Sequence, residues 1–129
     1  MGDWTFTFFK VMLIPIISMV GGLFGIYIPP IEINSMFGYR SLMSKKSQET
    51  WDFAQQYWGK LFLLLGKYLL IFSLLTIIFI YKRDQKTVEI VGGSWIIFQI
   101  ILMYCSFILT EIALKKNFDE NGNRKQNNF

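Results

Sequence analysis

Three long apolar runs constrain the fold of this chain more than any other feature of its sequence. Residues 11–31 and residues 90–110 contain no charged side chain, and residues 61–81 contain one, Lys67. Each run is long enough to cross about 30 Å of hydrocarbon as a helix that rises about 1.5 Å per residue. A chain of 129 residues is too small to cover three such helices with protein on every side. The runs therefore predict an all-α integral membrane protein with three transmembrane helices.

Outside the runs lie a short amino-terminal segment, a long loop (32–60), a short turn (82–86) and a polar tail (115–129), all within a single domain, 1–129. Three crossings place the amino terminus and the turn on one side of the membrane, and the loop and tail on the other. The first side carries Lys10, Lys82, Arg83 and Lys86, and the second carries Arg40, Lys45, Lys46, Lys60, Lys115, Lys116, Arg124 and Lys125. Because basic residues accumulate on the cytoplasmic side, we expect a multi-pass protein with its amino terminus outside and its carboxyl terminus in the cytoplasm.

A cleaved signal peptide is the alternative interpretation of the first run. The run is longer than the apolar region of a signal, and it continues into Pro29-Pro30 without a clear cleavage site. We therefore interpret it as a membrane span.

The sequence carries little of the chemistry that an enzyme or a metal site needs. It has no histidine, and its one cysteine, Cys105, lies inside the third run. The acidic residues after Asp119 do not fit the spacing of a calcium-binding loop, and Gly122 indicates a turn there instead. We expect no catalytic activity, no metal and no cofactor. The net charge of +4 suits anionic lipid headgroups, and no soluble basic module is present that would bind nucleic acid.

The long loop contains the best candidates for a binding or structural cap. Gly38 permits a sharp turn of the backbone, which leaves Tyr39 and Arg40 near the headgroup layer. Arg40 is able to form a bidentate ion pair with Glu49 or Asp52, and such a pair would fold the loop onto the following helix.

A helical pattern begins at Ser47, which is well suited to cap a helix amino terminus. Glu49 and Asp52 lie in or beside the first turn, and Trp51 and Trp58 recur at helical spacing. This pattern predicts a cytoplasmic interfacial helix that leads into the second transmembrane helix, with or without a break. Trp51 and its aromatic neighbours are either simple anchors at the membrane surface or part of the cap.

Two charged residues lie within or beside the apolar runs, where charges are costly and usually functional. Lys67 and Glu111 both lie toward the cytoplasmic side in the predicted topology, so they are able to form an ion pair. The alternative is that Lys67 extends to the headgroups and Glu111 pairs with Lys115 one turn away.

Together these residues resemble the SdpI family of bacterial membrane immunity proteins. The resemblance rests on Phe-Gly-Tyr-Arg-Ser at 37–41, followed by Glu-Thr-Trp at 49–51. Further matching positions are Asn34, Ser47, Ala54, Gly59, Gly66, Thr110, Glu111, Leu114, Phe118, Asp119 and Gly122. Ser41 stands where the family usually has threonine. The founding member of the family has an additional amino-terminal membrane region, so this chain corresponds to the SdpI-like module.

The resemblance implies a function by binding in the bacterial cytoplasmic membrane. The founding member protects a cell from a secreted toxic peptide and tethers a cytoplasmic autorepressor at the membrane. By this resemblance, Tyr39, Arg40, Glu49 and Trp51 would form a cytoplasmic cap, and the partners would be a toxic peptide and a repressor.

The alternative function is an accessory subunit of a larger membrane assembly, such as a transporter or a respiratory complex. Small residues at Gly21-Gly22-Gly25 and at Gly92-Gly93-Ser94 suit close packing against other helices. Association with other membrane subunits, or with further copies of this chain, is the expectation under this alternative.

Overall fold

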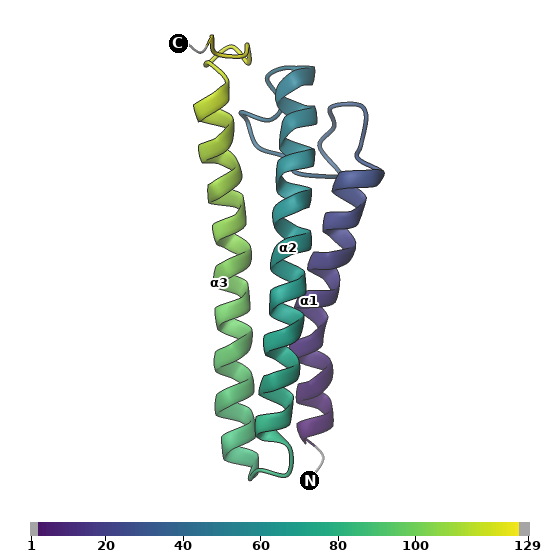
Figure 1. Cartoon of the computed structure of the whole chain (residues 1–129), viewed down its shortest axis with the longest axis vertical. Coiled ribbons are helices and arrows are strands. Elements are labelled where there is room, and N and C mark those ends of the chain that lie inside the picture. The colour runs from purple at the N-terminus through teal and green to yellow at the C-terminus, as the bar shows by residue number, and fades with distance from the viewer. Residues whose placement is uncertain (1–2, 127–129) are drawn as a thin grey trace.

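The computed structural model describes residues 3–126 and contains three helices that run alternately up and down in one bundle (Figure 1). They are α1 (Asp3–Tyr27), α2 (Gln48–Ile80) and α3 (Gln85–Asn117). Each helix is long and apolar enough to cross a membrane. The predicted all-α, three-span architecture is therefore confirmed. We call the end that holds the amino terminus and residues 81–84 the turn end, and the end that holds residues 28–47 and 118–126 the loop end.

Helix α1 starts and stops earlier than the apolar run that predicted it. It begins at Asp3 rather than at residue 11, because its first turns pack against the turn end, where Trp4 meets Tyr81 edge to face at 5.2 Å. It ends at Tyr27 rather than at residue 31. The reason is the Pro29-Pro30 pair, because a residue that precedes proline disfavours the helical conformation.

Helix α2 continues from the loop end into the membrane span without a break. Ser47 caps it as predicted, and Ser47 and Thr50 exchange side-chain and backbone hydrogen bonds in a capping box. The residues expected to form a helix leading into the second span are therefore the first part of α2 itself.

The connection between α2 and α3 is as tight as the sequence predicts. Asp84 caps α3 by accepting hydrogen bonds from the Thr87 backbone N–H (3.1 Å) and hydroxyl (2.7 Å). These hydrogen bonds lower the pKa of the Asp84 carboxyl below its usual range.

Glycines bring the backbones of α1 and α2 into direct contact. A Cβ atom on Gly22 would lie 2.5 Å from the Leu63 nitrogen, and one on Gly59 would lie 3.0 Å from the Gly25 carbonyl carbon. The close helix packing expected of Gly22 and Gly25 is therefore made within this chain, between α1 and α2.

Candidate functional site

The loop after α1 folds back over the bundle and inserts Tyr39 between α2 and α3. Tyr39 is 2% exposed, and its ring stacks on Phe107 with centroids 5.7 Å apart. Its hydroxyl donates a hydrogen bond to Glu111 Oε1 at 2.6 Å and shares the same hydrogen with the Phe107 carbonyl, at 3.2 Å. Tyr39 therefore joins the loop to the loop-end part of α3.

The environment of Tyr39 keeps its phenol protonated. Burial raises the pKa of Tyr39 most, and the hydrogen bond to Glu111 and the charge of that carboxylate raise it further. At neutral pH the phenol is therefore a fixed hydrogen-bond donor and does not take part in acid–base chemistry.

Gln55 holds the backbone of Tyr39 from the other side. Its side-chain oxygen accepts from the Tyr39 N–H at 2.8 Å, and its side-chain nitrogen donates to the Tyr39 carbonyl at 2.7 Å. Gly38 makes this approach possible, because its φ is +85° and a Cβ there would lie 2.5 Å from Gln55 Oε1. The role of Gln55 was not predicted from the sequence, although its position one helical turn after Trp51 places both on the same face of α2.

Trp51 fastens the start of the loop to α2. Its side chain is fully buried, and its indole N–H donates to the Pro30 carbonyl at 2.7 Å. Trp51 is therefore part of the cap and is not a simple membrane anchor.

The charged residues predicted to close the loop remain on its surface. Arg40, Glu49 and Asp52 are all exposed. Arg40 donates to the Ser35 carbonyl because the chain reverses at Gly38, and Asp52 accepts from Gln48 at 2.8 Å. Within residues 3–126, Arg40 does not form the expected ion pair with Glu49 or Asp52. The loop is closed instead by the hydrogen bonds of Tyr39, Gln55 and Trp51.

Removal of the Arg40 side chain is therefore expected to loosen the loop only locally. The Arg40→Ala variant loses the hydrogen bond to Ser35, and we expect cleavage within residues 35–47 by an added protease to speed up about three- to tenfold. Limited proteolysis in detergent, with Arg83→Ala at the turn end as the control, measures this change. Equal cleavage rates in the two variants would contradict the role of Arg40.

Lys67 and Glu111 do not form the ion pair that was one of the two alternatives predicted from the sequence. Glu111 accepts from Tyr39, whereas Lys67 is exposed on the outer surface of the bundle. Lys67 is therefore placed to extend its long side chain along the surface toward the headgroups.

The first part of the tail folds onto the loop end. Phe118 is 1% exposed and packs edge to face on Phe53. The chain then turns at Gly122, as predicted, with φ of +82°, and the Gly122 carbonyl accepts from the Ser47 hydroxyl at 2.7 Å. Loop, tail and the start of α2 therefore form one folded unit, which we call the cap.

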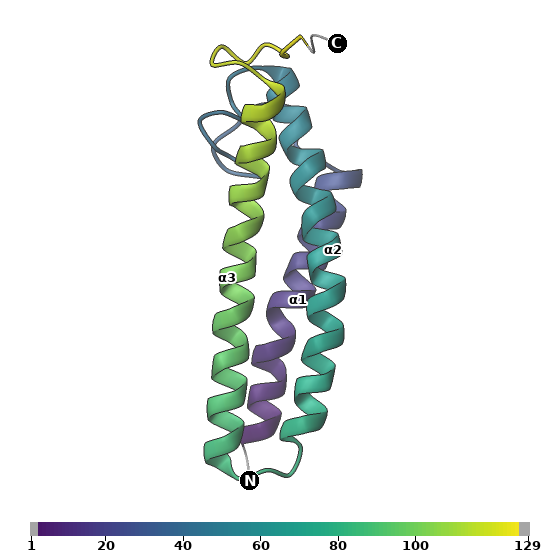
Figure 2. The same ribbon diagram turned by 60° about the vertical axis from the view of Figure 1, so that its left-hand side comes forward.

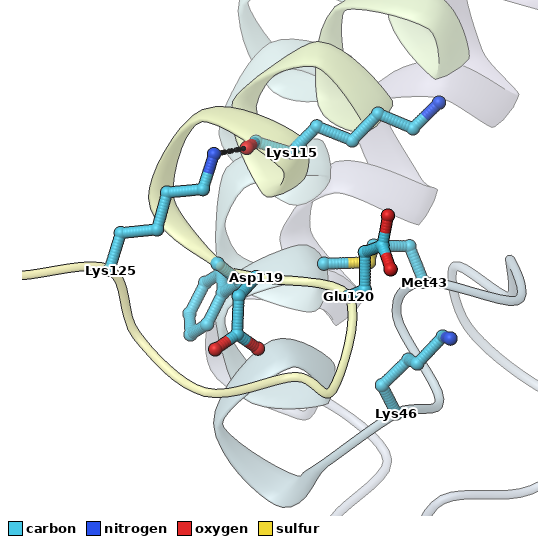
Figure 3. Close-up of a pocket in the computed structure, with 7 residues that line it drawn as sticks. Met43, Lys46, Lys115, Asp119, Glu120 and Lys125 are labelled. Atoms are coloured by element: carbon cyan, nitrogen blue, oxygen red, sulfur yellow. Dashed lines mark hydrogen bonds between the residues drawn. The ribbon is translucent and has the colours of Figure 1, made fainter.

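Within the described residues, pockets adjoin the cap on two sides. The first, of about 480 Å³, is lined by Met43, Lys46, Lys115, Phe118, Asp119, Glu120 and Lys125 (Figure 3). At one side of this pocket, Lys125 reaches back to the carbonyl of Lys115 at 2.9 Å. The several charged groups that line the pocket suit a polar partner. The second, of about 380 Å³, is mostly apolar and is lined by Gly21, Phe24, Gly25, Ile28, Pro30, Phe37, Gly38, Gln55 and Trp58. Within residues 3–126, no group of acidic, histidine or cysteine side chains is arranged to hold a metal ion.

Three membrane-spanning helices closed at one end by a folded cap define a multi-pass membrane protein. The model of the SdpI/YfhL protein family matches residues 30–112, and the chain belongs to this family. The matched range begins at Pro30, the acceptor of Trp51, and includes Glu111, the acceptor of Tyr39. No curated protein and no solved structure matches the chain significantly.

Proposed function

We propose that this chain is a membrane immunity or sensor protein that gives resistance to a toxic peptide by binding. The observation that carries the proposal is the cap, because residues within the family match close it. Tyr39 donates to Glu111, Trp51 donates to the Pro30 carbonyl, and Gly38 lies closely against Pro30 and Gln55. A loop that is held this firmly presents a fixed surface, and fixed surfaces bind with a smaller loss of conformational entropy.

The two ends of the bundle have different roles in this proposal. The three helices present exposed apolar side chains to the bilayer, and these side chains contact a membrane-active peptide there. The cap faces the cytoplasm, as the distribution of basic residues favours, and recruits a regulator there. Arg40, Glu49 and Asp52 are exposed on the cap and are the residues that we expect to contact this regulator.

The test is survival of a susceptible bacterium that expresses the chain together with a toxic peptide encoded beside it. We expect protection by the wild type and by Ser106→Ala, since Ser106 is buried and its hydroxyl donates to the Met103 carbonyl of its own helix. We expect no protection by Tyr39→Ala at an equal amount of protein in the membrane. If the wild type itself gives no gain in survival, the proposal is wrong.

The second candidate function is an accessory subunit of a larger membrane assembly. A Cβ on Gly93 would meet nothing within 4 Å, and Ser94 beside it is exposed on α3. Small residues on an open helix face allow another helix to approach closely. Purification in a mild detergent separates the two candidates, because stable co-elution with unrelated membrane subunits favours the subunit role.

A further inference from the structure

Helix α1 contains a proline in the middle of its span, and this proline leaves one carbonyl without its helical partner. Pro15 has no N–H, so the carbonyl of Val11 receives no hydrogen bond from within the helix. An unpaired carbonyl is costly inside a bilayer, where no water replaces the missing donor. Val11 is fully buried in the bundle, so its carbonyl needs a donor from a neighbouring helix.

Two side chains from the other helices supply this donor. Gln99 of α3 donates to the Val11 carbonyl at 3.1 Å, and Ser73 of α2 donates to it at 3.3 Å. The Ser73 hydroxyl in turn accepts from Gln99 at 2.8 Å and from the Trp95 indole at 2.8 Å. One carbonyl of α1 is therefore the point at which all three helices are joined by hydrogen bonds.

The orientation of the Gln99 amide follows from this arrangement. Its nitrogen must face Val11, because the reversed amide would place two carbonyl-type oxygens against each other. The Gln99 oxygen has no hydrogen-bond partner among the described residues, although the residue is fully buried. Both donor hydrogens of Gln99 are thus used to hold α1 and Ser73, and its oxygen adds nothing to the attachment.

We propose that Gln99 and Ser73 form a latch at the proline break of α1, and that opening the latch lets the segment before Pro15 swing away from α3. The course of α1 supports such a movement. It lies next to α3 at the turn end and diverges from α3 toward the loop end (Figure 2). The latch therefore holds α1 at the Val11 carbonyl, one helical turn before the proline about which the first segment swings.

A double-mutant cycle tests whether the hydrogen bond from Gln99 stabilises the bundle because Pro15 has no N–H. Pro15→Ala restores an N–H, so that Val11 is satisfied inside α1 and Gln99 is no longer needed. We expect Gln99→Leu to raise the unfolding constant in mixed micelles about tenfold when residue 15 is proline, and less than about threefold when it is alanine. Ser106→Ala is the control, since that hydroxyl is bonded only to Met103 of its own helix. Equal effects of Gln99→Leu in both backgrounds would overturn the proposal.

A disulfide trap reports the movement directly and does not depend on reversible unfolding. A Cβ on Gly92 would lie 3.8 Å from the Thr7 Cβ, which is the usual separation in a disulfide. Thr7→Cys and Gly92→Cys, combined with Cys105→Ser, are expected to cross-link rapidly on oxidation in membranes. We expect Gln99→Leu to slow this cross-link about tenfold, and the further change Pro15→Ala to restore the rate. A rate that Gln99→Leu leaves unchanged shows that no latch holds this segment.

Discussion

Replacement of Tyr39 by alanine is expected to release the loop from α2 and α3 while the three helices remain in the membrane. The truncation removes a buried aromatic ring, which costs about 3–5 kcal/mol at such positions. It also leaves Glu111 without the donor that the phenol supplies at 2.6 Å. Hydrogen exchange of the backbone in residues 34–47 measures the effect, and we expect protection to be lost there and retained in the middle of α2.

Two controls separate the contributions of Tyr39. Tyr39→Phe keeps the ring against Phe107 and removes only the hydroxyl, so we expect a smaller cost of about 1.5–3 kcal/mol, typical of a hydrogen bond to a charged group. Tyr104→Ala removes a ring that is 70% exposed, and we expect exchange in residues 34–47 to stay unchanged. If the loop exchanges equally fast in the wild type and in Tyr39→Ala, the phenol does not hold the cap.

The raised pKa of Tyr39 makes the stability of the cap depend on pH in the alkaline range. The folded cap favours the neutral phenol, because burial and Glu111 both oppose its ionisation. This stabilisation is fully present below the ordinary tyrosine pKa of about 10, and it is lost as the pH rises above that value toward the folded-state pKa. We expect protease sensitivity of residues 34–47 to increase above pH 10 in the wild type and to increase less in Tyr39→Phe. Identical profiles would contradict this coupling.

The features that were predicted from the sequence depend on local chemistry. The three spans follow from long runs without charge, the start of α2 from Ser47, and the turn in the tail from Gly122. Apolarity alone predicts that the first span reaches residue 31, whereas Pro29-Pro30 carries the local signal that ends α1 at Tyr27.

The contacts that were missed join residues that are distant in the sequence. Gln55 pairs with a backbone 16 residues away, and Gln99 with one 88 residues away, so neither partner is visible in a local pattern. Charge alone predicts a carboxylate partner for Arg40, but the turn at Gly38 brings the Ser35 carbonyl to it instead. Glu111 was recognised as unusual, and only the folded loop shows that its partner is a phenol and not Lys67.

The second large effect is expected at Gly38, where alanine should prevent the loop from closing. Gly38 has a φ of +85°, which costs a residue with a side chain about 1–2 kcal/mol. The added Cβ would also lie 2.5 Å from Gln55 Oε1 and 2.7 Å from Pro30 Cγ. One methyl group thus strains the turn and pushes away the amide that holds Tyr39, so we expect a total loss of about 2–5 kcal/mol.

Gly93→Ala is the matched control, because a Cβ on Gly93 would meet nothing within 4 Å and alanine favours the helix in which it lies. We expect Gly93→Ala to leave hydrogen exchange of residues 34–47 unchanged and Gly38→Ala to abolish their protection.

A second variant, Gln55→Ala, removes the amide and relieves its overlap with the new methyl group. If the overlap with Gln55 contributes as the geometry indicates, Gly38→Ala will cost less in the Gln55→Ala background than in the wild type. An equal cost in both backgrounds would assign the whole effect to backbone strain and to Pro30, and would remove Gln55 from the explanation of why this turn needs glycine.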